Sequence, residues 1–109
     1  MAYDEGLAEI LRDDLAEVAG VSEKRMFGGL CFLIDGNMLC GVHKGGAMFR
    51  VGKAREAEAL AIEGALPMGF TGRKMGGLID VTEEGFADDT RRAAWLSLAR
   101  GFVEALPPK

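Results

Sequence analysis

A glycine pair between two strand-like stretches, followed by a tight-turn signal, constrains the fold of this chain more than any other feature. Residues 25–29 read RMFGG, the apolar run 30–34 follows, and Asp35-Gly36 comes directly after it. Asp-Gly between apolar runs is a strong β-hairpin signal, because both turn positions require a positive φ. Glycine inside a strand pattern indicates a bulge or the close approach of another backbone. The segment therefore predicts one long strand over 24–34, bent at its glycines, with a hairpin after it.

Regular patterns along the rest of the chain complete the expected order of elements. They predict further strands at 38–42, 47–51, 68–71 and 75–81, and helices at 4–19, 53–63 and 88–106. Strands joined by short turns pair as antiparallel neighbours, and amphipathic helices need a sheet face to cover. We predict a single α+β domain over 1–109, a two-layer sandwich with an antiparallel five-stranded sheet and the order α-β(3)-α-β(2)-α. Trp95 is expected in its core.

Charge is distributed unevenly over the 109 residues, whose net charge is -4. Residues 1–20 carry six acids and one base, whereas residues 21–80 carry eight bases and six acids. Non-specific nucleic-acid binding depends on many phosphate contacts from Lys and Arg, so this balance argues against it. The first residues lack the pattern of a signal peptide, and no apolar run approaches the ~20 residues that span a bilayer. We expect a cytoplasmic protein without a membrane segment that does not bind duplex DNA directly.

Two cysteines flank the predicted hairpin. With Asp35-Gly36 as a two-residue loop, Cys31 is expected directly opposite Cys40. A cross-strand thiol pair is a candidate redox pair. The alternative is two small buried hydrophobes, which free cysteines commonly are. Because the cytosol keeps thiols reduced, we expect Cys31 and Cys40 to be reduced and structural.

No set of residues predicts a metal site or a catalytic centre. His43 follows Cys40 by three positions, but a structural zinc site needs four ligands and the chain offers only Cys31 beside these two. A Cys–His nucleophile pair would need a third, orienting group. The glycine pairs at 28–29, 45–46 and 76–77 do not fit a phosphate-binding loop. We therefore expect His43 to be an exposed turn residue, and expect no cofactor and no enzymatic activity.

Basic residues near strand ends and turns could converge into a patch. They are Lys24, Arg25, Lys44, Arg50, Lys53, Arg55, Arg73 and Lys74. Arg25 is singled out because an acid of the first helix could hold it in an ion pair; a ligand contact is the alternative. The candidate interaction or ligand contacts are Arg25, Gly28, Gly29, Arg50 and Lys74.

The order of elements and four sequence features resemble the N-terminal domain family of the TfoX/Sxy competence regulators. The features are RMFGG at 25–29, the Asp35-Gly36 turn, Arg50-Val51-Gly52 and Trp95, and the resemblance covers about residues 5–106. It implies a relation to transcriptional co-activators of DNA-uptake genes that act with a cyclic-AMP receptor protein. Full-length members carry a second, helical domain; because this chain ends at Lys109, we expect a stand-alone N-terminal domain. The family offers no catalytic residues to carry over.

The leading functional hypothesis is a small regulatory or protein-interaction module with an unknown protein partner. The alternatives are a small-ligand-binding protein or enzyme with a pocket at the glycine-rich strand ends, and a nucleic-acid-binding protein. The run 30–34 is apolar on both faces. An uncovered apolar patch usually marks an interface, so we also expect a homodimer.

Overall fold

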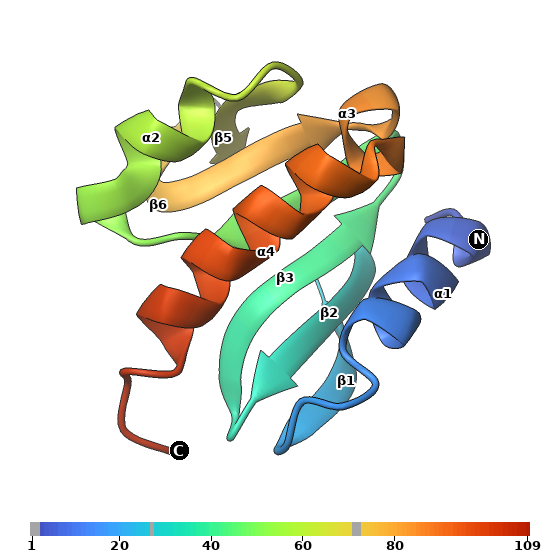
Figure 1. The fold of residues 1–109 in the computed structure, drawn as a ribbon, viewed down its shortest axis with the longest axis vertical. Helices are drawn as coiled ribbons and strands as arrows, with labels where there is room; N and C mark the ends of the chain where they lie inside the picture. Colours follow the sequence, from blue (N-terminus) through green and yellow to red (C-terminus); the bar gives the residue numbers. More distant parts are fainter. Residues whose placement is uncertain (1–2, 27, 71–72) are drawn as a thin grey trace.

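The chain folds into one antiparallel sheet with helices packed on it, as a computed structural model shows (Figure 1). The structure describes residues 3–26, 28–70 and 73–109, with 68–70 and 73–75 described by their backbone alone. The strands are β1 (Val21–Met26), β2 (Gly29–Ile34), β3 (Asn37–His43), β4 (Gly46–Arg50), β5 (Ala65–Phe70) and β6 (Arg73–Thr82). The helices are α1 (Glu5–Asp14), the 3-10 turn η1 (Lys53–Arg55), α2 (Glu56–Leu60), α3 (Glu83–Ala87) and α4 (Asp89–Val103).

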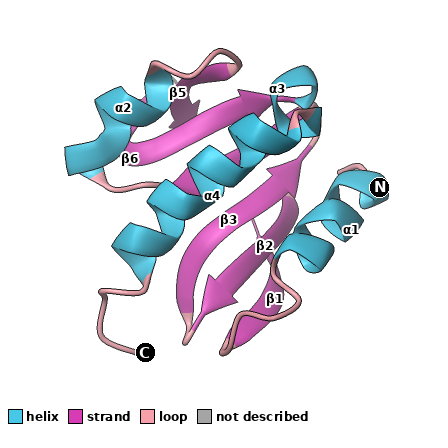
Figure 2. Cartoon of the chain, viewed as in Figure 1, coloured by secondary structure: helices cyan, strands magenta, loops and turns pink. Residues whose placement is uncertain are grey.

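All neighbouring strands pair antiparallel, in the order β1-β2-β3-β4-β6-β5. α4 packs on β3 and β4, and α1 packs on β3 beside it (Figure 2). Side chains from α1, α2, α3 and α4 all enter one hydrophobic core with β2, β3, β4 and β6. The two-layer α+β sandwich is therefore confirmed. None of the described helices is long and apolar enough to cross a bilayer.

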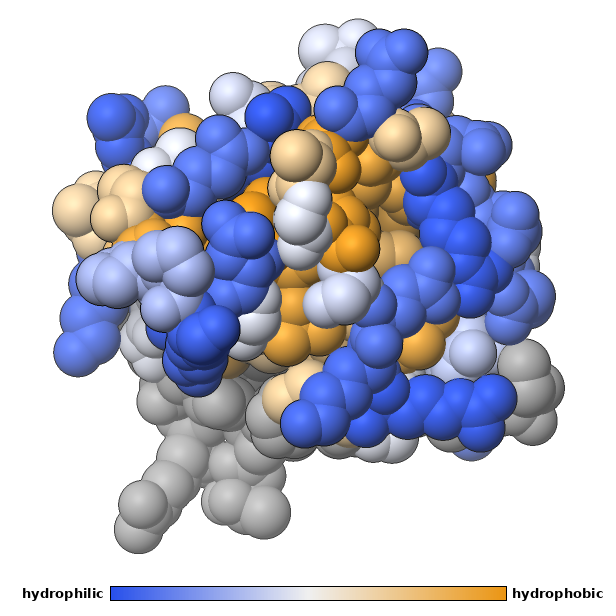
Figure 3. Space-filling model, turned by 90° about the horizontal axis from the view of Figure 1, so that it is seen from below, coloured by the Kyte–Doolittle hydropathy of each residue, from blue (hydrophilic) through white to orange (hydrophobic). Residues whose placement is uncertain are grey.

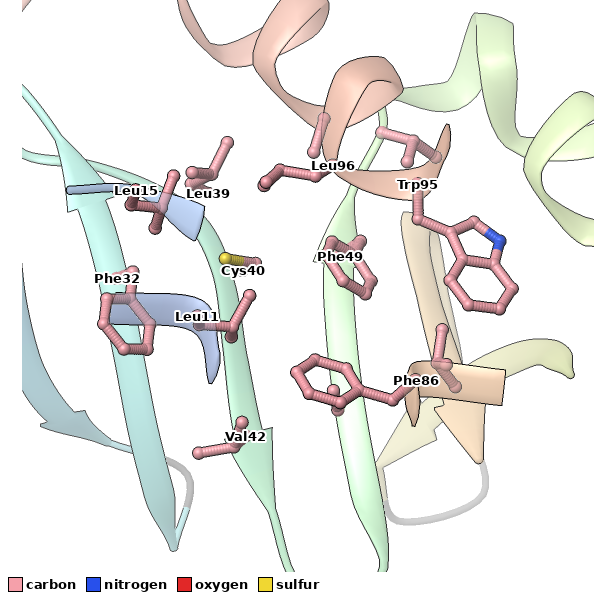
Figure 4. Close-up of a cluster of buried hydrophobic side chains, with 14 of the residues drawn as sticks. Leu11, Leu15, Phe32, Leu39, Cys40, Val42, Phe49, Phe86, Trp95 and Leu96 are labelled. Carbon is pink, nitrogen blue, oxygen red and sulfur yellow. The ribbon is translucent and has the colours of Figure 1, made fainter. Parts of the chain in front are cut away.

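Aromatic side chains fill the centre of this core (Figure 4). Phe49 of β4 stacks on Trp95 of α4 and on Phe86 of α3, with ring centroids 6.0 and 6.5 Å apart. Trp95 is fully buried, and its indole Nε1 donates to the backbone oxygen of Ala59, 3.1 Å away. This bond satisfies the one polar group that burial of the ring would otherwise leave unpaired. The prediction that Trp95 is a core residue is confirmed.

Side chains cap the starts of three helices, α1, α3 and α4. Asp4 accepts from the backbone nitrogen of Gly6 at the start of α1, and Asp88 accepts from that of Arg91 at the start of α4. Such caps satisfy backbone N–H groups that have no partner inside the helix. The helices are shorter than predicted: α1 ends at Asp14 and α4 at Val103. The predicted helix 53–63 is divided into η1 and the five-residue α2.

The predicted single strand over 24–34 is wrong, because the glycine pair forms a hairpin turn. Met26 of β1 pairs with Gly29 of β2, so the chain reverses between them. Gly28 has φ +73, a conformation that L side chains rarely adopt. A Cβ on Gly29 would lie 2.1 Å from the backbone oxygen of Val42, so only glycine fits there. The sheet consequently has six strands, where the sequence patterns predicted five.

The next hairpin has the predicted turn and a different register. Asp35 and Gly36 adopt φ +50 and +86, as the Asp-Gly signal predicts. The pairing then shifts between Phe32 and Leu33, so that Phe32 pairs with Cys40 and Cys31 pairs with Gly41. The prediction that Cys31 lies directly opposite Cys40 is therefore wrong. A β-bulge adds one residue to a strand and moves every later pair by one position.

Candidate functional site

The sheet face opposite the core, called the outer face below, carries a second and smaller hydrophobic cluster. Cys31, Met48 and Leu78 are buried there, with Met26 and Met38 packed against them. Cys31, Met48 and Leu78 are each adjacent to core residues along their strands, as the period of two in a β-strand requires. The apolar run 30–34 thus supplies both sides of the sheet.

A cavity of about 870 Å³ lies on this outer face and extends to Phe102 of α4. Its apolar lining comes from Met26, Leu33, Met38, Leu78 and Phe102. Binding sites for small molecules are usually concave, of about 300–1,000 Å³, with apolar walls and a few polar groups. The end of the molecule that carries the β2–β3 turn and the C terminus is seen in Figure 3, with apolar residues in a hollow between hydrophilic ones.

Four cations line the same cavity: Lys24, Arg50, Lys53 and Lys109. The described lining residues include no Asp or Glu. Arg50 is half-buried, and its guanidinium carbon lies 5.4 Å from the centre of the Phe102 ring. Its Nη1 donates to the backbone oxygen of Met38 across 3.4 Å. The ring and this hydrogen bond hold the guanidinium at the cavity wall.

Glycines form part of the wall, because the backbone approaches closely there. Gly52 has φ +84, and a Cβ on it would lie 2.5 Å from the Phe102 ring. Gly77 has φ +85, and its backbone nitrogen donates to the Glu56 carboxylate at 2.8 Å. Gly36 and Gly76 also line the cavity.

Four of the five contact residues predicted from the sequence, Arg25, Gly28, Gly29 and Arg50, are fully described, and among these four only Arg50 lines the cavity. Gly28 lies in the β1–β2 turn, and Gly29 is the first residue of β2. Arg25 is exposed on β1 and makes no ion pair with any described residue. The ion pair that joins the first helix to this strand is instead made by Arg12 and Glu23, with 2.8 Å between Nε of Arg12 and Oε2 of Glu23. Lys74 lies in β6, and its side chain is outside the described part of the structure.

Three cations of the cavity, Lys24, Lys53 and Lys109, are not among the contact residues predicted from the sequence. Lys24 and Lys53 belong to the basic residues near strand ends that were considered as a patch. The alternation of β1 could have identified Lys24, because Lys24 lies on the same face of the strand as Met26 and Arg25 does not. No local sequence pattern indicates that Lys109 lies at the cavity. Its position depends on a long-range hydrogen bond of 2.9 Å, which its backbone nitrogen donates to the backbone oxygen of Asp35.

The two cysteines are free, buried, and on opposite faces of the sheet. Cys40 belongs to the main core, whereas Cys31 belongs to the outer-face cluster. Burial raises the pKa of Cys31 to about 11. It also raises the pKa of Cys40. Thiolate is the reactive form of cysteine, so neither thiol is activated in this fold.

His43 is not the exposed turn residue that the sequence predicted. Its Nε2 lies 2.6 Å from a carboxylate oxygen of Asp80, and its ring is half-buried. The hydrogen bond to Asp80 raises the pKa of His43. No Ser, Thr or Cys side chain of the described residues bonds to this pair, and those residues include no cluster of three metal-ligating side chains. Among the residues that the structure describes, no nucleophile is therefore in hydrogen-bond contact with the pair.

Comparison with known proteins gives a family match. Residues 13–102 match the TfoX N-terminal domain. No curated protein and no solved structure matches the chain. Since the match covers most of the 109 residues and includes every strand, the chain belongs to the TfoX N-terminal domain family.

Proposed function

We propose that this chain is a regulatory domain that acts by binding a protein partner and catalyses no reaction. The observation that carries the proposal is the family match over residues 13–102. Full-length members of the family that this chain resembles act as transcriptional co-activators. We therefore propose that this chain also takes part in gene regulation, in the cytoplasm.

The chemistry of the described side chains favours binding over catalysis. A catalytic centre combines a nucleophile, a base and an orienting group within hydrogen-bond reach. Here the His43–Asp80 pair has no described nucleophile beside it, and Cys31 and Cys40 are buried with raised pKa values. These features support a binding domain.

The arginines of α4 favour a protein partner over duplex DNA. Arg91 pairs with Glu63 at 2.9 Å, Arg92 with Asp14 at 2.6 Å, and Arg100 with Glu104 at 2.5 Å. A phosphate would have to compete with these carboxylates. This helix would therefore contribute little to the phosphate contacts on which DNA affinity depends.

Transcript profiling tests the regulatory role. Removal of the protein from its native cell should change the abundance of a defined set of transcripts, and the wild-type chain should restore them. The Asp80→Asn variant, checked for folding by circular dichroism, should restore them equally well. No change on removal would contradict the proposal. Failure of the folded Asp80→Asn variant alone would instead favour a catalytic role for the His43–Asp80 pair.

Affinity capture from the native cell, followed by mass spectrometry, would identify the partner. The captured protein should then form a complex with the purified chain at a fixed stoichiometry, measured by light scattering. Absence of such a complex for every captured protein would contradict a protein partner while leaving the transcript result standing.

A further inference from the structure

The cavity on the outer face is lined by apolar and by cationic side chains, which are called its floor and its rim below. Its floor includes Met26, Met38 and Leu78, which come from three different strands, β1, β3 and β6. Methionine side chains are flexible and adapt to ligands of varied shape. An apolar floor of this kind favours an occupant with a hydrocarbon or aromatic body.

The charges at the rim determine which kind of apolar molecule fits. Lys24, Lys53 and Lys109 form no ion pair with any described residue. By contrast, five of the arginines elsewhere in the described chain, such as Arg12 and Arg92, are bound to carboxylates. The described side chains that line the cavity thus include four cations and no Asp or Glu, although the Glu56 carboxylate lies behind Gly77 and the whole chain is acidic with a net charge of -4. The field of such a lining attracts an anion and repels a cation.

Arg50 supplies directional recognition. A guanidinium has five N–H donors, and its planar arrangement suits a carboxylate or a phosphate. Among the described residues, its one hydrogen bond is the 3.4 Å contact to Met38. The Phe102 ring, 5.4 Å from the guanidinium carbon, orients the group without using its donors.

We propose that this cavity binds a small amphipathic anion, whose acidic head group lies against Arg50 and the three lysines and whose apolar body covers the methionine floor. The volume of about 870 Å³ and the four cationic side chains, with no Asp or Glu among the described lining residues, carry the assignment. Carboxylate and phosphate head groups share the chemistry required. The site exists whether or not the domain regulates genes, so it goes beyond the function proposed above.

Eight-carbon probes with different head groups test the proposal on the full chain. Octanoate and octyl phosphate should each bind in calorimetric titrations, and comparing them shows which head group is preferred. Octylammonium, with the same chain and the opposite charge, should bind at least tenfold more weakly. Acetate and inorganic phosphate, which lack the chain, should also bind at least tenfold more weakly.

Methionine methyl signals locate the binding. In protein labelled at the methionine methyl carbons, octanoate should shift the signals of Met26 and Met38, which line the cavity. Equal shifts with octylammonium, or no shifts at all, would overturn the proposal. The proposal would also be overturned if the Met26 and Met38 signals shifted with protein concentration in the absence of any probe. Such shifts would show that two copies of the chain contact each other at the cavity.

Adjacent residues of β1 provide a matched pair of variants. Lys24→Gln removes a rim cation, whereas Arg25→Gln removes one cation from the next position, which does not line the cavity. Lys24→Gln or Lys53→Gln should weaken octanoate binding about threefold, and Arg50→Gln about tenfold, or ~1.4 kcal/mol. Arg25→Gln and Lys44→Gln should leave it unchanged. Equal losses in all of these variants would overturn the site, because they would reflect net charge alone.

Discussion

At the scale of single residues, Gly28 and Gly29 have different structural roles. Gly29→Ala would place a Cβ 2.1 Å from the Val42 backbone oxygen, which belongs to a neighbouring strand. We expect this substitution to lower the free energy of unfolding by about 2–3 kcal/mol, because backbone atoms must move to admit the methyl group. Urea unfolding measures the loss.

Gly28→Asn is the matched control. The described structure places nothing within 4 Å of a Cβ at Gly28, and its φ of +73 is one that Asn tolerates. The expected loss is below about 1 kcal/mol. Equal losses at Gly28 and Gly29 would show that the turn conformation, and not the approach to Val42, makes these glycines necessary.

Arg92 and Arg91 are neighbours in sequence with different environments. The Arg92 side chain is 10% exposed and lies 2.6 Å from Asp14 and 2.9 Å from Asp89, and it donates to the Phe86 oxygen at 3.0 Å. Arg92→Ala should cost about 2–3 kcal/mol of unfolding free energy, because it leaves Asp14 and the Phe86 oxygen without this partner. Arg91→Ala, at an exposed pair, should cost less than about 1 kcal/mol. Equal costs in chemical denaturation would contradict this difference.

The His43–Asp80 pair should make stability depend on pH. Its hydrogen bond raises the pKa of His43 in the folded state. The stabilisation is therefore complete below the unfolded pKa of about 6.5 and is lost as pH rises through the folded pKa. Because both groups are partly exposed to solvent, we expect Asp80→Asn to cost only about 0.5–1 kcal/mol at pH 6 and less at pH 9. Urea unfolding of both proteins at both pH values is the measurement, and a pH-independent deficit would contradict the assignment.

At the scale of elements, the register shift in the β2–β3 hairpin determines the environment of both thiols. Cys31 is 1% exposed on the outer face and Cys40 is fully buried in the core. Titration with a thiol reagent in the absence of reductant should therefore find two reactive groups in unfolded protein and none in the native protein on the same timescale. Finding no thiol in either state would show a disulfide and restore the redox-pair hypothesis.

At the scale of the whole molecule, the paired arginines of α4 and the net charge of -4 predict weak binding to duplex DNA. Non-specific DNA binding typically has a dissociation constant of about 10⁻⁴ to 10⁻⁶ M at physiological salt. We expect this chain to bind more weakly than that range. Fluorescence anisotropy at about 150 mM salt is the test, because physiological ionic strength is close to that value. Micromolar binding that falls steeply with added salt would contradict the prediction.

The alternation and turn signals were sufficient for the fold class, because they depend on residues close together in the chain. Asp35 and Gly36 turn as predicted, and Trp95 lies in the core. Arg50 lines the cavity, whereas its contact with a ligand stays a prediction. The same signals could not distinguish a bent strand from a hairpin at Gly28, since glycine permits both.

Tertiary structure alone decided the rest. The shift between Phe32 and Leu33 moved Cys31 and Cys40 to opposite faces, and no local pattern marks a bulge of this kind. His43 met Asp80, 37 positions later in the chain, through the pairing of β4 with β6. Lys109 reached the cavity through the bond to Asp35. The local sequence therefore determined which elements form, whereas contacts between distant segments determined which side chains meet, because strand register and chain closure depend on the packing of the whole sheet.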